Sequence, residues 1–481
     1  MYSVPFHFFL FRKRHIDCLI RIKGQNHLGN TLRRLFMKYR FSSKEVRDQL
    51  YDYNFDAGVL PEGHPTKVDI WDETLRDGEQ SPGVYLTQED KITIAKALDE
   101  IGVPLVAVGF PAVSQTELET VKAITNEGYT TSKILAIARP RKGDIDACIQ
   151  ANVDEIVIFM PTSQLMMTIL KVTPEKEIEV IRNMITYAKD HGLTVNWVSE
   201  DASRAQLAHL NNVHRAAVES GVKRIVLGDT VGVLTPSSVT YLVQKTKEAI
   251  KGINGSVGLG VHMHNDFGLA VANSVEAVLH GAKFPHTCVN GYGERAGNAA
   301  FEEVVMNLER LGINTGIKLD KLFELSQLVE KLFCLPLNMH KPVVGPFSFS
   351  HESGLHVNAI LTHPLTYEPI NPKVVGRRRK FYLGKLSGSG AIINALSEKL
   401  KLINMDFPKE VLSEIVQKVK EHQEKAPKDD IRKIYDRIKE DLAKITSGVS
   451  DKEFYEIVRE IVGSELKEYL KDKKNKNLMN P

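Results

Sequence analysis

The stretch "KVDIWDETLRDGE", residues 67–79, joins an apolar run to a dense group of charges that includes Arg76 and Asp77. The apolar part is typical of a buried strand, whereas the charges need solvent or a partner. Seven similar β-branched runs follow, at 104–110, 132–138, 155–160, 194–199, 224–229, 258–264 and 286–290. The first run is therefore one of eight candidate strands.

Amphipathic helical stretches separate these runs. The segment 173–192, for example, has Thr173 as N-cap, Pro174 in the first turn and Gly192 at the stop. Eight strands that alternate with helices over about 250 residues predict an α/β fold, a (β/α)8 TIM barrel. The alternative is an open doubly wound sheet, which is disfavoured because no GxGxxG follows the first strand.

The barrel accounts for only part of the 481 residues. We predict a basic N-terminal extension at 1–66, the catalytic barrel at 67–320, a small mixed lid or linker at 321–395 and a helical C-terminal region at 396–481. Residues 1–36 allow two interpretations. Either the chain is written with too early a start and Met37 is the first residue, or the segment is a transit peptide.

Charge and composition exclude some classes of function. The chain is 42% hydrophobic and 26% charged, and it has no run of 18 apolar residues, which disfavours a membrane span. Residues 1–44 hold ten Lys or Arg and one Asp, a net of +9, so the rest carries −6 of the total +3. This mildly acidic body disfavours nucleic-acid binding. Four cysteines without a CxxC pair favour the reducing cytoplasm.

Polar residues stand directly after several strands, and the carboxyl ends of barrel strands meet at one mouth. His262 and His264 are two apart in a strand and so face the same side. With Asp77 they predict a site for a divalent cation, Zn, Mn, Co or Mg, although a hydrogen-bonded pair of core histidines is the alternative. After the fifth strand, Glu200 is a candidate acid or base, and we assign Asp201 to a helix N-terminus.

Three motifs together resemble a known family. "DETLRDGEQSPGV", "HMHNDFGLAVAN" and "VNGYGERAGNAAFEEVV" resemble the signatures of the acetyl-CoA-dependent 2-oxo acid condensing enzymes, which are the 2-isopropylmalate, homocitrate and citramalate synthases. The lyases for 3-hydroxy-3-methylglutaryl-CoA resemble it less, because they have a cysteine in the glycine loop after the last strand. The resemblance implies a metal-dependent condensation of acetyl-CoA with a 2-oxo acid, and a homodimer.

The resemblance also implies a role for individual residues. The cation would be held by Asp77, His262, His264 and Asn298, and the substrate by Arg76 at its carbonyl and Thr230 at its carboxylate. Proton transfer would involve Glu200, with His356 and Tyr367 from "HESGLHVNAILTHPLTY", a segment that closes over the mouth. Gly291 and Gly293 would let the backbone approach acetyl-CoA.

The choice of 2-oxo acid depends on less conspicuous positions. The fifth strand of homocitrate synthases resembles "RFSSED", but here Asn196 and Val198 stand in "NWVSED", and Ala136 replaces an expected histidine. An unpaired buried carboxylate is expensive, so we favour 2-oxoisovalerate, with pyruvate or 2-oxoglutarate as alternatives. The charged helical tail instead resembles that of short homocitrate and citramalate synthases, which puts leucine inhibition in doubt. A barrel that binds acyl-CoA or metal without turnover is the alternative of another class.

Overall fold

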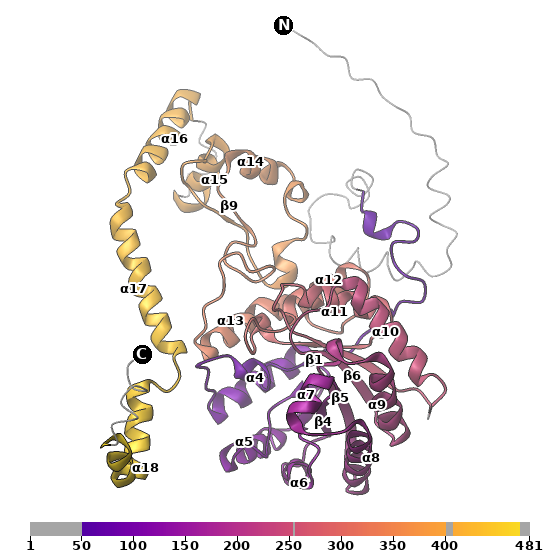
Figure 1. Cartoon of the computed structure of the whole chain (residues 1–481). Helices are drawn as coiled ribbons and strands as arrows, with labels where there is room; N and C mark the ends of the chain where they lie inside the picture. The colour runs from indigo at the N-terminus through magenta and orange to yellow at the C-terminus, as the bar shows by residue number, and fades with distance from the viewer. Residues whose placement is uncertain (1–50, 254, 401–406, 472–481) are drawn as a thin grey trace.

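The computed structural model describes residues 51–253, 255–400 and 407–471. Within them, eight parallel strands close into a barrel in sequence order, so that β1 pairs with both β2 and β8 (Figure 1). The strands are β1 Trp71–Asp72, β2 Leu105–Ala107, β3 Lys133–Ala138, β4 Glu155–Pro161, β5 Thr194–Glu200, β6 Arg224–Asp229, β7 Gly258–Met263 and β8 Phe284–Thr287. The predicted TIM barrel is confirmed.

Helices surround this barrel on the outside (Figure 1). They are α4 Gln88–Ile101, α5 Gln115–Thr125, α6 Lys142–Gln150, α7 Gln164–Leu170, α8 Pro174–Asp190, α9 Leu207–Glu219, α10 Pro236–Ile250, α11 Ala270–Leu279 and α12 Phe301–Arg310. The predicted ends of α8 are confirmed: the Thr173 side chain accepts from Lys176 N, Pro174 opens the helix, and Gly192 has a φ of 82°.

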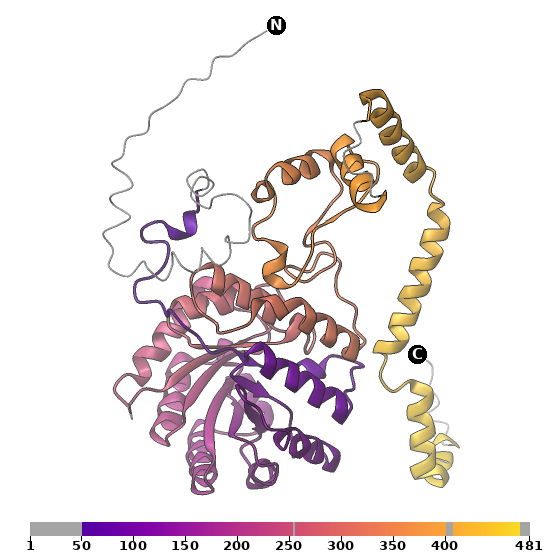
Figure 2. The same ribbon diagram turned by 180° about the vertical axis from the view of Figure 1, so that it is seen from behind.

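The segment after the barrel is mixed, and the tail is helical. It contains α13 Leu322–Phe333, a two-stranded sheet of β9 Ser350–His351 and β10 Lys380–Phe381, α14 Gly354–Thr362 and α15 Ser389–Leu400. The helices α16 Lys409–Glu424, α17 Lys428–Thr446 and α18 Asp451–Lys471 then run down one side of the molecule (Figures 1 and 2). The segment boundaries that we predict stay predictions.

The two faces of each strand have different surroundings. Leu135 and Ile137 of β3 join a small apolar cluster with Trp71, Val157 and Val226, inside the barrel. Their neighbours along the strand belong to the large cluster between barrel and helices. Side chains alternate along a strand, so the odd-numbered residues of β3 point inward. This alternation decides which side chains of β3 can reach the mouth.

Within the described residues, no helix is both long and apolar enough to cross a membrane. Cys148 and Cys288 are buried, as expected of small core residues, whereas Cys334 is exposed. The interpretations of residues 1–36 lie outside the described residues. The cytoplasmic location stays a prediction.

Asp72, the last residue of β1, is fully buried beside Thr74. Its Oδ1 and Oδ2 accept from Thr74 N and Oγ1, both at 2.9 Å. Burial raises the pKa of Asp72 to about 8, against the opposing hydrogen bonds from Thr74. The folded protein therefore holds this proton more tightly than the unfolded chain, whose Asp pKa is about 4.

We expect this difference to make stability depend on pH. The contribution of Asp72 is fully present below about pH 4 and is lost as pH rises through about 8. Asp72→Asn should flatten the decline in unfolding free energy over that window, measured by urea denaturation at several pH values. An unchanged slope in the variant would show that Asp72 is not the group responsible.

Candidate active site

A cavity of about 310 Å³ opens where the carboxyl ends of the strands meet. One wall is polar and the other is apolar. The cavity is lined by Arg76, Asp77, Gln80, Phe110, Ile137, Val157, Phe159, Val198, Glu200, Gly228, Thr230, His262, His264, His286, Glu294 and Arg295. Seven of the fourteen residues predicted for the site thus line one cavity: Arg76, Asp77, Val198, Glu200, Thr230, His262 and His264.

The predicted cation ligands converge within this cavity. Asp77 Oδ2 lies 3.0 Å from His262 Nε2 and 3.5 Å from His264 Nε2, and the two imidazole nitrogens lie 3.2 Å apart. Asn298 Nδ2 lies 3.1 Å from the same Asp77 oxygen, while its Oδ1 is buried with no partner among the described residues. Two imidazoles, a carboxylate and an amide oxygen that lacks a partner are a donor set that fits a divalent cation.

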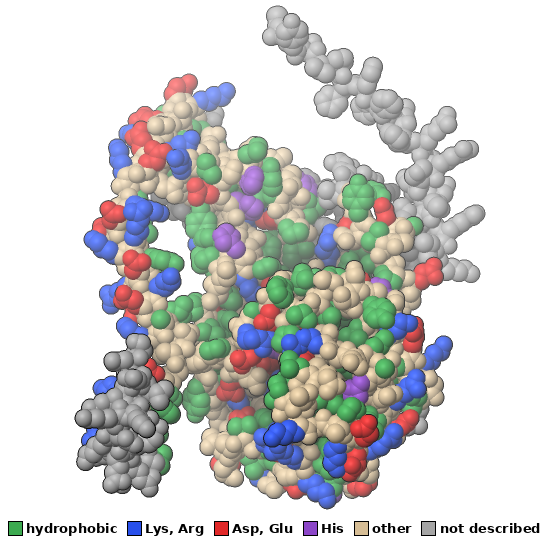
Figure 3. Space-filling view, viewed as in Figure 1, with side chains coloured by type: hydrophobic (Ala, Val, Ile, Leu, Met, Phe, Trp, Pro, Cys, Tyr) green, Lys and Arg blue, Asp and Glu red, His purple; other side chains and the backbone are tan. Residues whose placement is uncertain are grey.

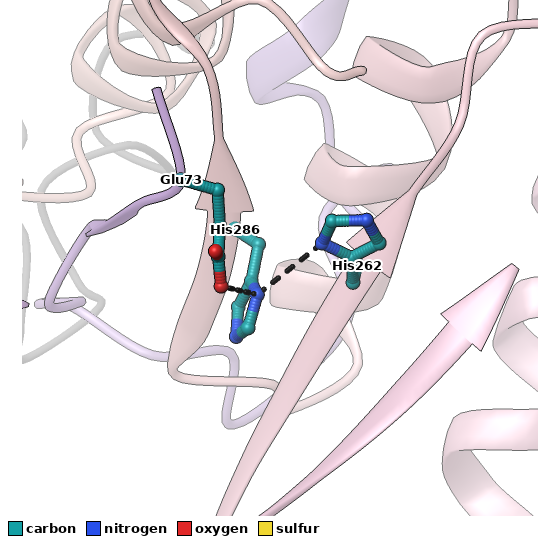
Figure 4. A group of neighbouring side chains, drawn as sticks. All are labelled: Glu73, His262 and His286. Atoms are coloured by element: carbon teal, nitrogen blue, oxygen red, sulfur yellow. Dashed lines mark hydrogen bonds and ion pairs between the residues drawn. The ribbon is translucent and has the colours of Figure 1, made fainter. Parts of the chain in front are cut away.

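A second group, Glu73 and His286, lies on the Nδ1 side of the His262 ring (Figure 4). His286 Nδ1 lies 3.0 Å from Glu73 Oε1 and 3.3 Å from His262 Nδ1, and its ring stacks on Trp71 at 4.3 Å. A partner at Nδ1 fixes the orientation of the His262 ring and leaves Nε2 facing Asp77. We did not predict a role for either residue, although His286 opens the expected run 286–290 and Glu73 stands in the first motif.

His286→Phe should weaken cation binding by about 10–100-fold, because it keeps a ring against Trp71 but removes the nitrogen that orients His262. Titration of the metal-free protein with Mn²⁺ in a calorimeter would measure this change. We expect the thermal unfolding temperature to change little. Unchanged Mn²⁺ affinity would contradict a positioning role for His286.

Arg76 interacts electrostatically with both groups, through Glu73 and through Asp77. Its Nε donates to Glu73 Oε2 at 2.7 Å, and its Nη1 lies 3.7 Å from Asp77 Oδ2. Burial alone would raise the pKa of Glu73, but the charge of Arg76 and the hydrogen bond from His286 hold that pKa at about 2. Burial lowers the pKa of His264 to about 3, so its imidazole is neutral at pH 7 and can act as a ligand.

The residues after β5 separate into two roles. Glu200 lines the cavity, and burial, followed by the charge of Asp201, raises the pKa of its carboxyl. Asp201 stands at the N-cap of the 3-10 helix Ala202–Arg204, as assigned, but its side chain makes no capping hydrogen bond to the described backbone there. Its carboxylate instead accepts from Ser163 Oγ and pairs with Arg204 Nε at 2.7 Å, because the left-handed backbone at Asp201 turns the side chain away. Its backbone N–H donates to Thr230 Oγ1 at 2.8 Å.

The glycine loop after β8 packs against the polar wall. A Cβ at Gly293 would lie 2.2 Å from Asn298 Nδ2, and one at Gly291 would lie 3.2 Å from Asn298 O. Ser81 Oγ accepts from Gly293 N at 2.9 Å, which ties this loop to the first one. The two glycines therefore make room for Asn298, and their approach to acetyl-CoA stays a prediction.

Two predictions about the substrate pocket are wrong. Ala136 points outward to the helices, because it has the opposite parity to Ile137, which lines the cavity. Asn196 faces inward but lies a layer below the mouth, where its Nδ2 donates to Glu155 Oε2 at 3.0 Å and its Oδ1 accepts from Arg224 Nη1 at 3.0 Å. Of the three residues, only Val198 lines the cavity.

The apolar wall contains residues that we did not predict. Phe110, Ile137, Val157 and Phe159 line the cavity together with Val198, and Phe110 and Phe159 meet edge to face with ring centres 6.3 Å apart. Strand alternation could have identified Ile137, Val157 and Phe159, and Phe110 is the last residue of the expected run 104–110.

His356 and Tyr367 do not line this cavity. Their rings stack on each other at 4.0 Å, in the segment that holds α14. Figure 3 shows histidine side chains gathered on the outer face of that segment. Within one chain, the two residues meet each other and do not join the predicted cation ligands in this cavity.

A buried lysine on α4 connects the first two loops of the mouth. Lys91 is 1% exposed, and its Nζ lies 2.7 Å from Glu79 Oε2 and 2.9 Å from Glu117 Oε1. Glu117 Oε1 also accepts from Phe110 N at 3.2 Å, and Glu79 Oε1 accepts from Leu86 N at 3.1 Å. One cation therefore holds both loops in place.

Lys91→Met should destabilise the fold by about 3 kcal/mol, since it leaves two partly buried carboxylates uncompensated. Urea unfolding would measure this loss. Lys96→Met is the matched control, because Lys96 lies on the same helix and pairs with Glu127 at a 51%-exposed position. Equal stability of the two variants would contradict the bridging role.

Fold and site together define a barrel enzyme with a candidate divalent-cation centre at its mouth. A family model described as HMGL-like matches residues 67–329, and one described as homocitrate synthase post-HMGL domain-like matches residues 343–427. The chain belongs to the HMGL-like family, and the resemblance to its condensing synthases is confirmed.

Three curated relatives carry three different synthase names. The chain is 44% identical to homocitrate synthase AksA of Methanothermobacter thermautotrophicus, over 75% of this chain and 90% of the relative. It is 44% identical to a probable 2-isopropylmalate synthase of Ignicoccus hospitalis (76% and 95%), and 42% identical to (R)-citramalate synthase CimA of Methanocaldococcus jannaschii (84% and 77%). These relatives establish the class of condensing synthase and leave the 2-oxo acid open.

The HMG-CoA lyase of Bacillus subtilis shares the fold. It has a TM-score of 0.52 and 22% sequence identity, and the match covers 58% of this chain and 97% of the lyase.

Proposed function

We propose that this protein condenses acetyl-CoA with a 2-oxo acid that has an apolar side chain, 2-oxoisovalerate, to give 2-isopropylmalate and CoA. The observation that supports this choice is the apolar wall of Phe110, Ile137, Val157, Phe159 and Val198, opposite the cation ligands. A branched aliphatic side chain would bury its surface there at about 25 cal/mol per Å².

The charges of the cavity disfavour 2-oxoglutarate. Two arginines line it, and both are already paired: Arg76 with Glu73 at 2.7 Å and Arg295 with Asp266 at 2.9 Å. A distal carboxylate would therefore enter an apolar wall with no free cation among the described lining residues, which is costly. Pyruvate, with only a methyl group, would leave part of the wall unfilled.

The polar wall supplies the groups that the chemistry requires. A divalent cation held by Asp77, His262, His264 and Asn298 would polarise the 2-oxo acid's carbonyl. Arg76 faces the same cavity, so its guanidinium can stabilise the negative charge that develops on the carbonyl oxygen. Thr230 would hold the substrate carboxylate. The raised pKa of Glu200 suits an acid or base in the proton transfers of acetyl-CoA.

Release of CoA, measured with a thiol reagent, tests the proposal. The purified protein should release CoA from acetyl-CoA with Mn²⁺ and 2-oxoisovalerate, faster than with pyruvate or 2-oxoglutarate. Faster turnover of 2-oxoglutarate would overturn the pocket argument. No release with any of the three acids would favour a barrel that binds without turnover.

We further propose a homodimer in which the segment of His356 and Tyr367 acts at the partner's mouth. Along α17 several apolar side chains stay uncovered in the single chain, with Ile434 61% and Ile438 60% exposed. An uncovered apolar helix face indicates a missing partner. The proposal predicts that inactive His262→Ala and His356→Ala variants regain activity when mixed and reassembled. Failure of a mixed dimer to regain activity would contradict it.

A further inference from the structure

A second cavity, of about 860 Å³, lies at the end of the barrel opposite the mouth. It opens where β6, β7 and β8 begin, at Arg224, Gly258 and Phe284, and where α10 ends, at Ile250. The amino ends of the strands meet at this face, so the cavity is separate from the candidate active site.

The walls of this cavity carry a strong excess of positive charge. Five cationic side chains line it, against the single carboxylate of Glu248: Lys223, Arg224, Lys247, Lys251 and Lys283. Glu248 is itself paired with Lys245 at 2.7 Å, and the nearby Asp69 is paired with Lys67 at 3.5 Å. A concave surface of one sign concentrates the field and attracts counter-ions.

The floor of the cavity does not neutralise this charge. Arg224 is 6% exposed, and its guanidinium lies over the Phe284 ring at 4.6 Å. The buried Glu155 is shared by Arg224, by Lys223 at 2.6 Å and by Lys133 at 3.6 Å. The single negative charge of Glu155 is therefore shared by three cations and leaves a net positive charge. In addition, Arg224 Nε is buried with no hydrogen-bond partner among the described residues.

Two glycines leave room for the cationic side chains. A Cβ at Gly258 would lie 3.0 Å from Arg224 Cγ, and a Cβ at Gly281 would lie 2.5 Å from Lys247 Nζ, which donates to His280 O at 2.9 Å. These side chains are therefore held at the cavity by the backbone around them. Lys251 and Lys283, at its rim, have no ion-pair partner in the part of the chain that the structure describes.

We propose that this cavity is a binding site for a small multivalent anion carrying phosphate or carboxylate groups. Lys251 and Lys283 would bind the anion directly, and Lys223, Lys247 and Arg224 would supply the surrounding positive potential. Because the site lies at the opposite end of the barrel, the anion would not compete with the substrates. This inference does not depend on which 2-oxo acid is used.

Calorimetric titration of the purified protein at low ionic strength tests the site, with inorganic phosphate and malonate as separate probes. Saturable 1:1 binding is expected for at least one probe, and the tighter of the two identifies the preferred anion. The double variant K251A/K283A should bind about tenfold more weakly and should keep its CoA-release activity. The control K418A/K444A removes the same charge from α16 and α17 and should bind as the unmodified protein does.

Three outcomes would overturn the proposal. They are no saturable binding of either probe, equal weakening in both double variants, and displacement of the probe by 2-oxoisovalerate. The last would place the anion at the mouth. If the protein released no CoA but bound phosphate through Lys251 and Lys283, the proposed function would fail and the proposed anion site would stand.

Discussion

His262→Ala should lower the rate of CoA release by about 10³-fold or more, since it removes a cation ligand worth several kcal/mol of charge stabilisation. His262 Nε2 lies 3.0 Å from Asp77 Oδ2 and 3.2 Å from His264 Nε2, so the substitution removes a donor atom that lies between two others. Calorimetry should show a parallel loss of Mn²⁺ binding.

The fold should survive this substitution, because the barrel interior is held by a separate apolar cluster around Trp71 and Leu135. Circular dichroism and the thermal unfolding temperature check this. His191→Ala is the matched control, since the His191 side chain is exposed and contacts the carbonyl and ring of Tyr187, away from the cavity. Full activity of His262→Ala would refute the cation assignment.

Arg76→Lys should lower the turnover rate by about 10²–10³-fold while leaving the KM for acetyl-CoA nearly unchanged. The planar guanidinium reaches Glu73 through Nε and Asp77 through Nη1 at the same time, and a single ammonium cannot do both. The charge near the carbonyl oxygen is then retained but misplaced. Steady-state CoA release would separate the effect on turnover from the effect on KM.

Arg182→Lys serves as the control for this second prediction, because Arg182 makes an exposed pair with Glu219 on the outer helices. It should retain full activity. If Arg76→Lys raised the KM of the 2-oxo acid and left turnover unchanged, Arg76 would bind the ground state and would have no special role in the transition state.

The barrel could be predicted from sequence because its signal is repeated eight times. The spacing of His262 and His264 pointed to a candidate cation site, and the resemblance added Asn298 to the predicted ligands. The pocket was harder to predict. Ala136 and Ile137 are neighbours in one apolar strand, and only the register of the closed sheet shows which one faces inward. The role of His286 was missed because one histidine in a strand gives no sign of its partners, and Glu73 and His262 come from other parts of the barrel.

The hydrogen bonds of Asn196 inside the barrel could not be predicted from the sequence for another reason. Its partners, Glu155 and Arg224, come from strands 41 and 28 residues away, and nothing local marks them as neighbours. The same holds for Lys91, whose bridge to Glu117 depends on two helices packing side by side. Contacts of this kind are set by topology, and a single sequence does not encode them in any periodic pattern.

The pairing of β1 with β8 has a consequence for biosynthesis. Trp71 lies opposite His286 in the register, so the first strand must wait for more than 200 residues to leave the ribosome before it gains its second neighbour. Contacts so distant in sequence form slowly, and an unpaired edge invites association with other chains. His286 both pairs with β1 in the closed ring and contacts His262, so we expect barrel closure to complete the candidate cation centre as well.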